Sequence, residues 1–212
     1  MKKYLLIAAA LLTAFAFVSC NKDEEVEKEK EEQGGEQGGG QEVEAASICI
    51  NEVNGVKGYK GIEIYNPGDK AVDLKDWSIK KNDEVDDAEA GTSLYWKGIE
   101  GCSVPAKGFY VIHASKDDGN LPEKTEGCVA TGGLSNKKAV KLELINPEGK
   151  TVDTFNRGYD SSAEAPEVSL DELAGSFARE TDGAAAWKLM EPTFGATNNG
   201  AALVGDGVIT GM

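Results

Sequence analysis

Two glutamates, Glu52 and Glu63, lie in neighbouring stretches whose alternating pattern predicts β-strands. Carboxyl groups that two strands bring face to face can do acid–base chemistry, because their environments shift their pKa values apart. The alternative is structural: with Asn51 and Asn66, the glutamates would hydrogen-bond backbone groups at strand ends and turns. No nucleophile, histidine or aromatic cleft is tied to the pair in the sequence, which favours the structural interpretation.

His113 is the only histidine of the chain, so a Ser-His-Asp triad or a histidine-based metal site would have to use it. It follows the apolar run 109–112, where a predicted strand leaves into a loop. A single histidine in such a place is more often a surface or partly satisfied residue than a catalyst. We therefore expect no enzymatic activity.

An acidic loop at residues 80–91 is the best candidate for a metal site, because calcium prefers clustered carboxylate oxygens. The loop lacks the glycine that an EF-hand needs at its sixth position, and a solvated loop that aids solubility explains the same composition. Calcium is the only cofactor that the sequence suggests. The residues that would bind it are Asp83, Glu84, Asp86 and Asp87.

Cys102 and Cys128 flank the apolar run 109–112 and the loop after it, so a disulfide between them would pin that loop. Closing a loop of about 25 residues stabilises a fold by about 3 kcal/mol in the chain-entropy model. Cys49 lies between two isoleucines and is expected to be buried as a small apolar residue. No Cys-x-x-Cys spacing is present, which argues against zinc.

The first 19 residues have the features of an export signal. Lys2 and Lys3 precede an apolar run that is too short to span a bilayer comfortably, so residues 1–19 are predicted to be a signal peptide. Cys20 follows Ser19 in an arrangement that resembles a bacterial lipobox, which implies lipidation of Cys20. The alternative is a cleaved secretory leader with an unmodified Cys20.

The acidic residues just after Cys20 resemble the surface-export signal of Bacteroidota lipoproteins. The resemblance implies a lipid-anchored protein of the outer membrane that is exposed on the cell surface. The rest of residues 20–46 consists of Glu-Lys repeats and glycine runs without core-forming side chains, so a disordered linker is expected. A short helix over residues 24–32 is the alternative.

The formal net charge of the chain is -15. A protein this acidic repels phosphate backbones, so nucleic acid is not expected as a partner. It also repels anionic membrane surfaces, which favours a lipid anchor over electrostatic adhesion as the contact with the membrane.

From residue 47 onward, short alternating runs are separated by Gly, Pro, Asn and Asp, which predicts an all-β sandwich. The run 109–112 is continuously apolar and is expected to be buried on both faces. The loop 114–133 is long enough to be functional or mobile. The expected strands are 47–53, 61–66, 72–74, 77–79, 92–96, 109–112, 139–145, 151–155, 176–179 and 187–189.

The order of several short motifs over residues 47–198 resembles the lamin tail domain family. The motifs are INEV at 50–53, IEIYNP at 62–67, AVDL at 71–74, PAKG at 105–108 and PTFGATN at 192–198. The resemblance implies an immunoglobulin-like β-sandwich. In that family the matching positions are structural, and here they are Asn51, Glu52, Glu63, Asn66, Trp77 and Trp187.

These observations predict four regions: signal peptide 1–19, anchor and linker 20–46, sandwich domain 47–198 and a C-terminal tail 199–212. The first functional expectation is a surface-anchored, non-enzymatic binding module for an extracellular protein or glycan. The alternatives are an accessory module of a secreted hydrolase or nuclease system, and a structural envelope protein.

Overall fold

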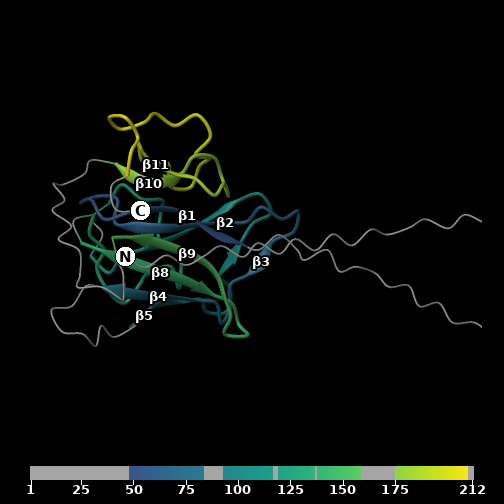
Figure 1. The fold of residues 1–212 in the computed structure, drawn as a ribbon. Helices are drawn as coiled ribbons and strands as arrows, with labels where there is room; N and C mark the ends of the chain where they lie inside the picture. The colour runs from purple at the N-terminus through teal and green to yellow at the C-terminus, as the bar shows by residue number, and fades with distance from the viewer. Residues whose placement is uncertain (1–47, 84–92, 117–118, 137, 159–174, 210–212) are drawn as a thin grey trace, which may run out of the picture. The chain divides into compact units, whose positions relative to one another are not determined.

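The structure is a computed structural model that describes residues 48–83, 93–116, 119–136, 138–158 and 175–209. Within those ranges it consists of β-strands, turns and loops (Figure 1). None of the described residues forms a helix long and apolar enough to cross a membrane. The strands are β1 (Cys49–Asn54), β2 (Gly61–Tyr65), β3 (Val72–Asp73), β4 (Ser78–Asp83), β5 (Ser93–Lys97), β6 (Ser103–Val104), β7 (Phe109–His113), β8 (Val140–Ile145), β9 (Thr151–Arg157), β10 (Ser176–Arg179) and β11 (Trp187–Met190).

Two antiparallel sheets form the layers of a sandwich. One has the strand order β11-β10-β1-β2-β7 and the other β5-β4-β8-β9, while β3 and β6 form a small pair of their own. Figure 1 shows β10, β11, β1 and β2 in one layer and β9, β8, β4 and β5 in the other. The predicted immunoglobulin-like all-β sandwich is therefore confirmed, with β6 as a short strand that the alternation does not reveal.

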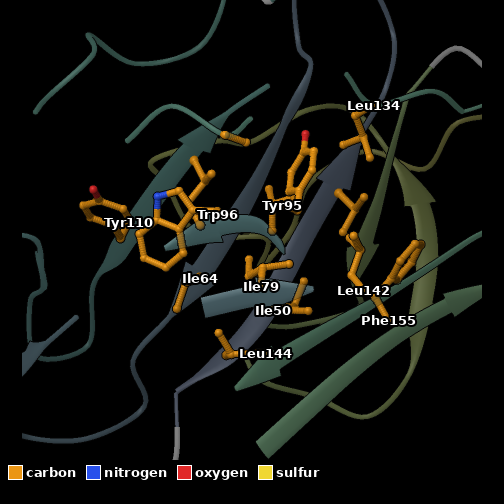
Figure 2. Packing of buried hydrophobic residues seen from close by; sticks show 14 of the residues in the cluster. Ile50, Ile64, Ile79, Tyr95, Trp96, Tyr110, Leu134, Leu142, Leu144 and Phe155 are labelled. Atoms are coloured by element: carbon orange, nitrogen blue, oxygen red, sulfur yellow. The ribbon is translucent and has the colours of Figure 1, made fainter. Parts of the chain in front are cut away.

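The core lies between the two sheets, and aromatic pairs cross it. The ring centroids of Trp96 and Tyr110 are 5.9 Å apart, and those of Phe155 and Phe177 are 5.8 Å apart. Figure 2 shows the first pair close together, beside buried aliphatic side chains. Each pair joins one sheet to the other, and aromatic pairs add about 0.5–1.5 kcal/mol to the effect of their buried area.

A charged contact also joins the sheets. The Arg179 guanidinium donates through Nη2 to both carboxylate oxygens of Asp153, at 3.0 and 2.8 Å. Its Nε donates to the Ile50 carbonyl at 2.6 Å, and Asp153 Oδ2 accepts from the Ile50 N–H at 2.7 Å. Because this largely buried pair also satisfies a backbone donor and acceptor of β1, it fixes β9 and β10 against that strand.

A β-bulge in β1 sets which of its side chains face the core. Ile50 pairs with Ile64 and Glu52 with Glu63, so Asn51 is the extra residue. A bulge lets two successive side chains leave the strand on the same side. Asn51 and Glu52 consequently both lie on the outer face of the five-stranded sheet, while Ile50 and Val53 stay in the core.

β7 is an edge strand, and this corrects the prediction of a strand buried on both faces. Tyr110 and Ile112 are buried in the core, whereas Phe109 and Val111 are only partly buried. An edge strand has one neighbour, and here the outer face is only partly covered, so an apolar run does not ensure burial on both sides. β4 extends to Asp83, so residues 80–83, which were predicted to belong to the acidic loop, are part of a strand.

Candidate functional site

The two glutamates face each other on the outer side of the five-stranded sheet. Glu52 and Glu63 are register partners on β1 and β2, and both are fully buried, with 0 % of their surface exposed. Buried carboxyl groups need hydrogen-bond partners. The partners come from the segment that follows β11, residues 193–198, which we call the latch (in the yellow-green to yellow part of Figure 1).

The latch donates its backbone to the carboxyl groups. The Thr193 N–H lies 3.2 Å from both oxygens of Glu52, and the Gly195 N–H donates to Glu63 Oε2 at 2.6 Å. The second oxygen of Glu63 accepts from Asn51 Nδ2 at 3.0 Å. The carboxyl pair therefore holds a loop in place on the sheet and is committed to structural hydrogen bonds.

Asn198 closes the latch at its other end. Its side-chain amide donates to the carbonyls of Asn51, at 3.3 Å, and Arg179, at 3.1 Å. Its backbone N–H donates to Asp182 Oδ1 at 2.9 Å. Like Glu52 and Glu63, Asn198 is fully buried. The latch is thus joined to β1, β2 and β10 through side chains that solvent does not reach.

Burial shifts the protonation of both glutamates. It raises the pKa of Glu63 to about 8, against the lowering effect of the hydrogen bonds from Asn51 and Gly195. Burial also raises the pKa of Glu52. The Thr193 hydroxyl lies 2.7 Å from Glu52 Oε2 and 2.6 Å from Asn198 Oδ1, and one hydroxyl proton can serve only one of these acceptors. A protonated Glu52 that donates to Thr193 satisfies all three groups.

The other family-motif residues have structural contacts. Asn66 donates to the carbonyls of Lys70, at 2.7 Å, and Pro105, at 3.0 Å, and accepts from the Gly68 N–H at 2.9 Å. Trp77 packs against the core. Trp187 also packs against the core and stacks under the Arg179 guanidinium, with the Cζ atom 4.8 Å from the ring centroid.

His113 is buried, with 2 % of its surface exposed, so of the two interpretations, a surface or a partly satisfied residue, the surface one is wrong. Its backbone pins the following loop to β7. The His113 N–H donates to the Cys128 carbonyl at 2.7 Å, and the His113 carbonyl accepts from the Ala130 N–H at 2.8 Å. The described part of the loop 114–133 is therefore held against the sheet.

The structure describes Cys49, Cys102 and Cys128 as free thiols, and the disulfide between Cys102 and Cys128 stays a prediction. Cys102 Sγ accepts from the Tyr110 hydroxyl at 3.3 Å and lies 3.6 Å from the Glu126 carbonyl. These contacts and the backbone pairing with His113 hold the loop against the sheet. Cys49 is partly buried beside charged groups, and burial raises the pKa of its thiol to about 11.

The predicted calcium site lies mostly outside the described residues. Asp83 ends β4, whereas Glu84, Asp86 and Asp87 fall in the undescribed range 84–92. Among the residues with described positions, no three His, Cys, Asp or Glu side chains are grouped closely enough to hold a metal ion.

A groove of about 480 Å³ lies between β6 and β7, and we call it the β6–β7 groove. The loop 122–126 forms a third wall, and Gly195 of the latch lies at its end. A side chain at Gly195 would place its Cβ 3.0 Å from Pro122, so the latch and the loop are in close contact. The carboxyl pair thus also positions one wall of the groove.

The groove combines apolar walls with an acidic rim. Phe109, Pro105 and Pro122 supply apolar surface, and the rings of Phe109 and Tyr65 stack with centroids 5.2 Å apart. The carboxylates at the rim belong to the exposed residues Glu100, Glu123 and Glu126. No lysine, arginine or histidine is among the described residues that line it.

A tight turn holds the acidic wall in place. The Cys128 N–H donates to the Thr125 carbonyl at 3.3 Å, and Gly127 adopts a φ of 76° inside the turn. Trp96 Nε1 donates to the Gly127 carbonyl at 2.7 Å. Since these contacts reach the core, the groove is formed before any ligand arrives.

The family model of the Lamin Tail Domain matches residues 41–159, more than half of the chain, and the chain belongs to this family. The lamin tail resemblance noted in the sequence is thereby confirmed. No curated protein matches the chain. The family is an immunoglobulin-like, non-catalytic module, which fits an interaction role for this domain.

Sequence reasoning missed two parts of this arrangement, the latch and the groove. The break in alternation at Asn51-Glu52 is the signal that could have indicated a bulge, and with it two polar side chains in need of a cover. The groove has no comparable signal: three of its segments lie within residues 100–126, but only folding sets them around one hollow and brings Gly195 of the latch beside them.

Proposed function

We propose that this chain is a surface-anchored lipoprotein whose lamin tail domain binds an extracellular protein or glycan without chemical turnover. The observation that carries the proposal is the β6–β7 groove, which is preformed and open to solvent. The polar groups nearest to it, among them the Cys102 thiol and the Tyr110 hydroxyl, bond to each other. The carboxyl pair is committed to the latch.

The anchoring part of the proposal rests on sequence. The leader, Cys20 and the acidic residues behind it favour lipidation and display outside the outer membrane. Residues 20–46 would give the domain reach, since a flexible linker of about 25 residues has a root-mean-square span of roughly 25–30 Å.

A blocked groove tests the binding role. Ser103 is exposed on β6 and lines the groove, so Ser103→Trp should fill it without disturbing the core. Thr154→Trp, on the exposed face of β9, is the matched control. The immobilised full chain would be exposed to envelope and extracellular material, and bound components identified by mass spectrometry.

We expect a component that the parent and Thr154→Trp retain and that Ser103→Trp loses. Equal capture by all three proteins would contradict a binding role for the groove. Chemical alteration of the bound component by the purified chain would contradict the absence of turnover. Specific capture of a hydrolase or nuclease would identify the accessory role among the binding roles.

A further inference from the structure

The edge of β7 that faces the groove has open backbone groups. His113 directs its N–H and carbonyl away from β2, to Cys128 and Ala130. In an antiparallel pair, alternate residues point their backbone groups to the same side. Val111 therefore directs its N–H and carbonyl away from β2 as well, into the side where the groove lies.

The chain that pairs with His113 does not continue along β7 to Val111. The turn at Thr125–Cys128 bends it away, and the Gly127 and Glu126 carbonyls are taken by Trp96 and Cys102. No hydrogen bond joins the outward backbone groups of Val111 to another described residue. An exposed strand edge of this kind is a template for an added strand.

The negative charge around the groove indicates that the added strand should carry basic side chains. Glu123 and Glu126 are exposed beside the open edge, and Glu100 lies across from them with its carboxylate 3.5 Å from Lys75. The whole chain has a net charge of -15, which attracts cations from a distance. The rings of Phe109 and the prolines suit the aliphatic stems of long basic side chains.

We propose that the β6–β7 groove binds an extended, basic peptide segment of a partner protein, which adds as a short strand along β7. The proposal rests on the binding role above and names the class of partner. The peptide backbone pairs with Val111, and lysine or arginine side chains meet Glu123 and Glu126. A glycan would fit this groove less well than a peptide, because it has no alternating N–H and carbonyl groups to pair with the strand edge.

Fluorescence anisotropy with three labelled hexapeptides tests the proposal on the purified full chain. The probes are alternating Lys-Val, alternating Glu-Val, and Lys-Val with N-methyl groups on alternate residues, which removes strand donors but keeps the charge. The protein variants are Glu123→Lys/Glu126→Lys and a control with the same change of charge, Glu148→Lys/Glu180→Lys, at exposed sites outside the groove.

We expect the Lys-Val peptide to bind, with affinity that falls as salt rises, and to lose at least tenfold in affinity on N-methylation and with Glu123→Lys/Glu126→Lys. The control variant should lose less than threefold. An equal loss of affinity in both protein variants would mean that overall charge alone explains the binding. If the methylated or the acidic peptide bound as tightly as the Lys-Val peptide, strand addition would be excluded. If no basic peptide binds while Ser103→Trp still abolishes capture from native material, the peptide proposal fails and the binding role stands.

Discussion

At the scale of single residues, burial determines what Glu52 and Glu63 do. Both side chains are fully buried and accept hydrogen bonds from the latch, so both have a structural role in holding it on the sheet. Their raised pKa values have the same cause, because the low-dielectric surroundings disfavour a charged carboxylate. The shifted pKa values of the two glutamates therefore follow from their burial under the latch.

The pH dependence of stability should follow Glu63. Its pKa rises from 4.5 to about 8 on folding, so the folded state binds the proton more tightly than the unfolded chain. The free energy of unfolding should therefore fall as pH rises from about 4.5 to 8, by at most about 1.4 kcal/mol per pH unit for this proton. Glu63→Gln should flatten the slope measured by urea denaturation across this range. A slope unchanged from that of the parent protein, with Glu148→Gln as the exposed control, would contradict this assignment.

Gly127 should tolerate no side chain. It has a φ of 76°, and a Cβ there would lie 2.6 Å from Cys102 Sγ. We expect Gly127→Ala to lower the free energy of unfolding by about 2–4 kcal/mol, since a steric clash adds to the backbone strain. Gly149 has a φ of 82°, and a Cβ there would meet nothing within 4 Å, so Gly149→Ala measures the strain alone. Thermal unfolding that shows equal losses for both variants would rule out the clash.

At the scale of elements, the latch and the loop 122–126 are parts of one wall. The latch is held by buried carboxyl groups, and the loop by a turn that is bonded to Trp96 and Cys102. They meet where Gly195 approaches Pro122. A change that loosens the latch should thus reach the groove without a substitution in the groove itself.

Thr193→Val tests the latch, because it keeps the shape of the side chain and removes the hydroxyl next to Glu52 and Asn198. Loss of a buried hydrogen-bond partner should lower the free energy of unfolding by about 1–3 kcal/mol, as measured in urea. Thr154→Val on the exposed face of β9 is the control and should change stability little. A difference between the two variants of less than about 0.5 kcal/mol would mean that the hydroxyl is dispensable.

At the scale of the whole molecule, the proposed protein has three parts: a lipid anchor, a flexible linker and a binding domain. The anchor would attach it to the membrane, the linker would give the domain reach, and the domain would recognise the partner. The acidic charge of the chain fits this arrangement, because net negative charge repels anionic surfaces and attracts cationic groups.

Replacement of the lipidation site tests the anchor. Cys20→Ala should move the protein from the membrane fraction to the soluble fraction, since a membrane contact through acyl chains requires the thiol. The melting temperature of the domain should not change, because Cys20 lies outside the domain that the family model matches. A Cys20→Ala protein that still sediments with membranes would contradict the anchor. Fractionation with detergent phase partition provides the measurement.

The sequence predicts most strands, because local alternation and turn residues carry the information for them. The hairpin between β8 and β9 illustrates this: Asn146 accepts from the Lys150 N–H at 2.8 Å, and Gly149 has the positive φ that the turn needs. The burial of β7 could not be predicted from local sequence, since an apolar run is equally compatible with a central strand and an edge strand.

The amino-acid sequence is enough to establish the class of the protein: an all-β domain of the lamin tail family, with two glutamates better suited to structure than to catalysis. The packed sheets were needed to show what the glutamates hold and that an open strand edge lies beside an acidic rim. The physical reason is the separation along the chain between the residues that interact. Strands follow from neighbours in the chain, whereas the latch lies more than 130 positions from its carboxyl partners and is positioned only when the sheets have packed.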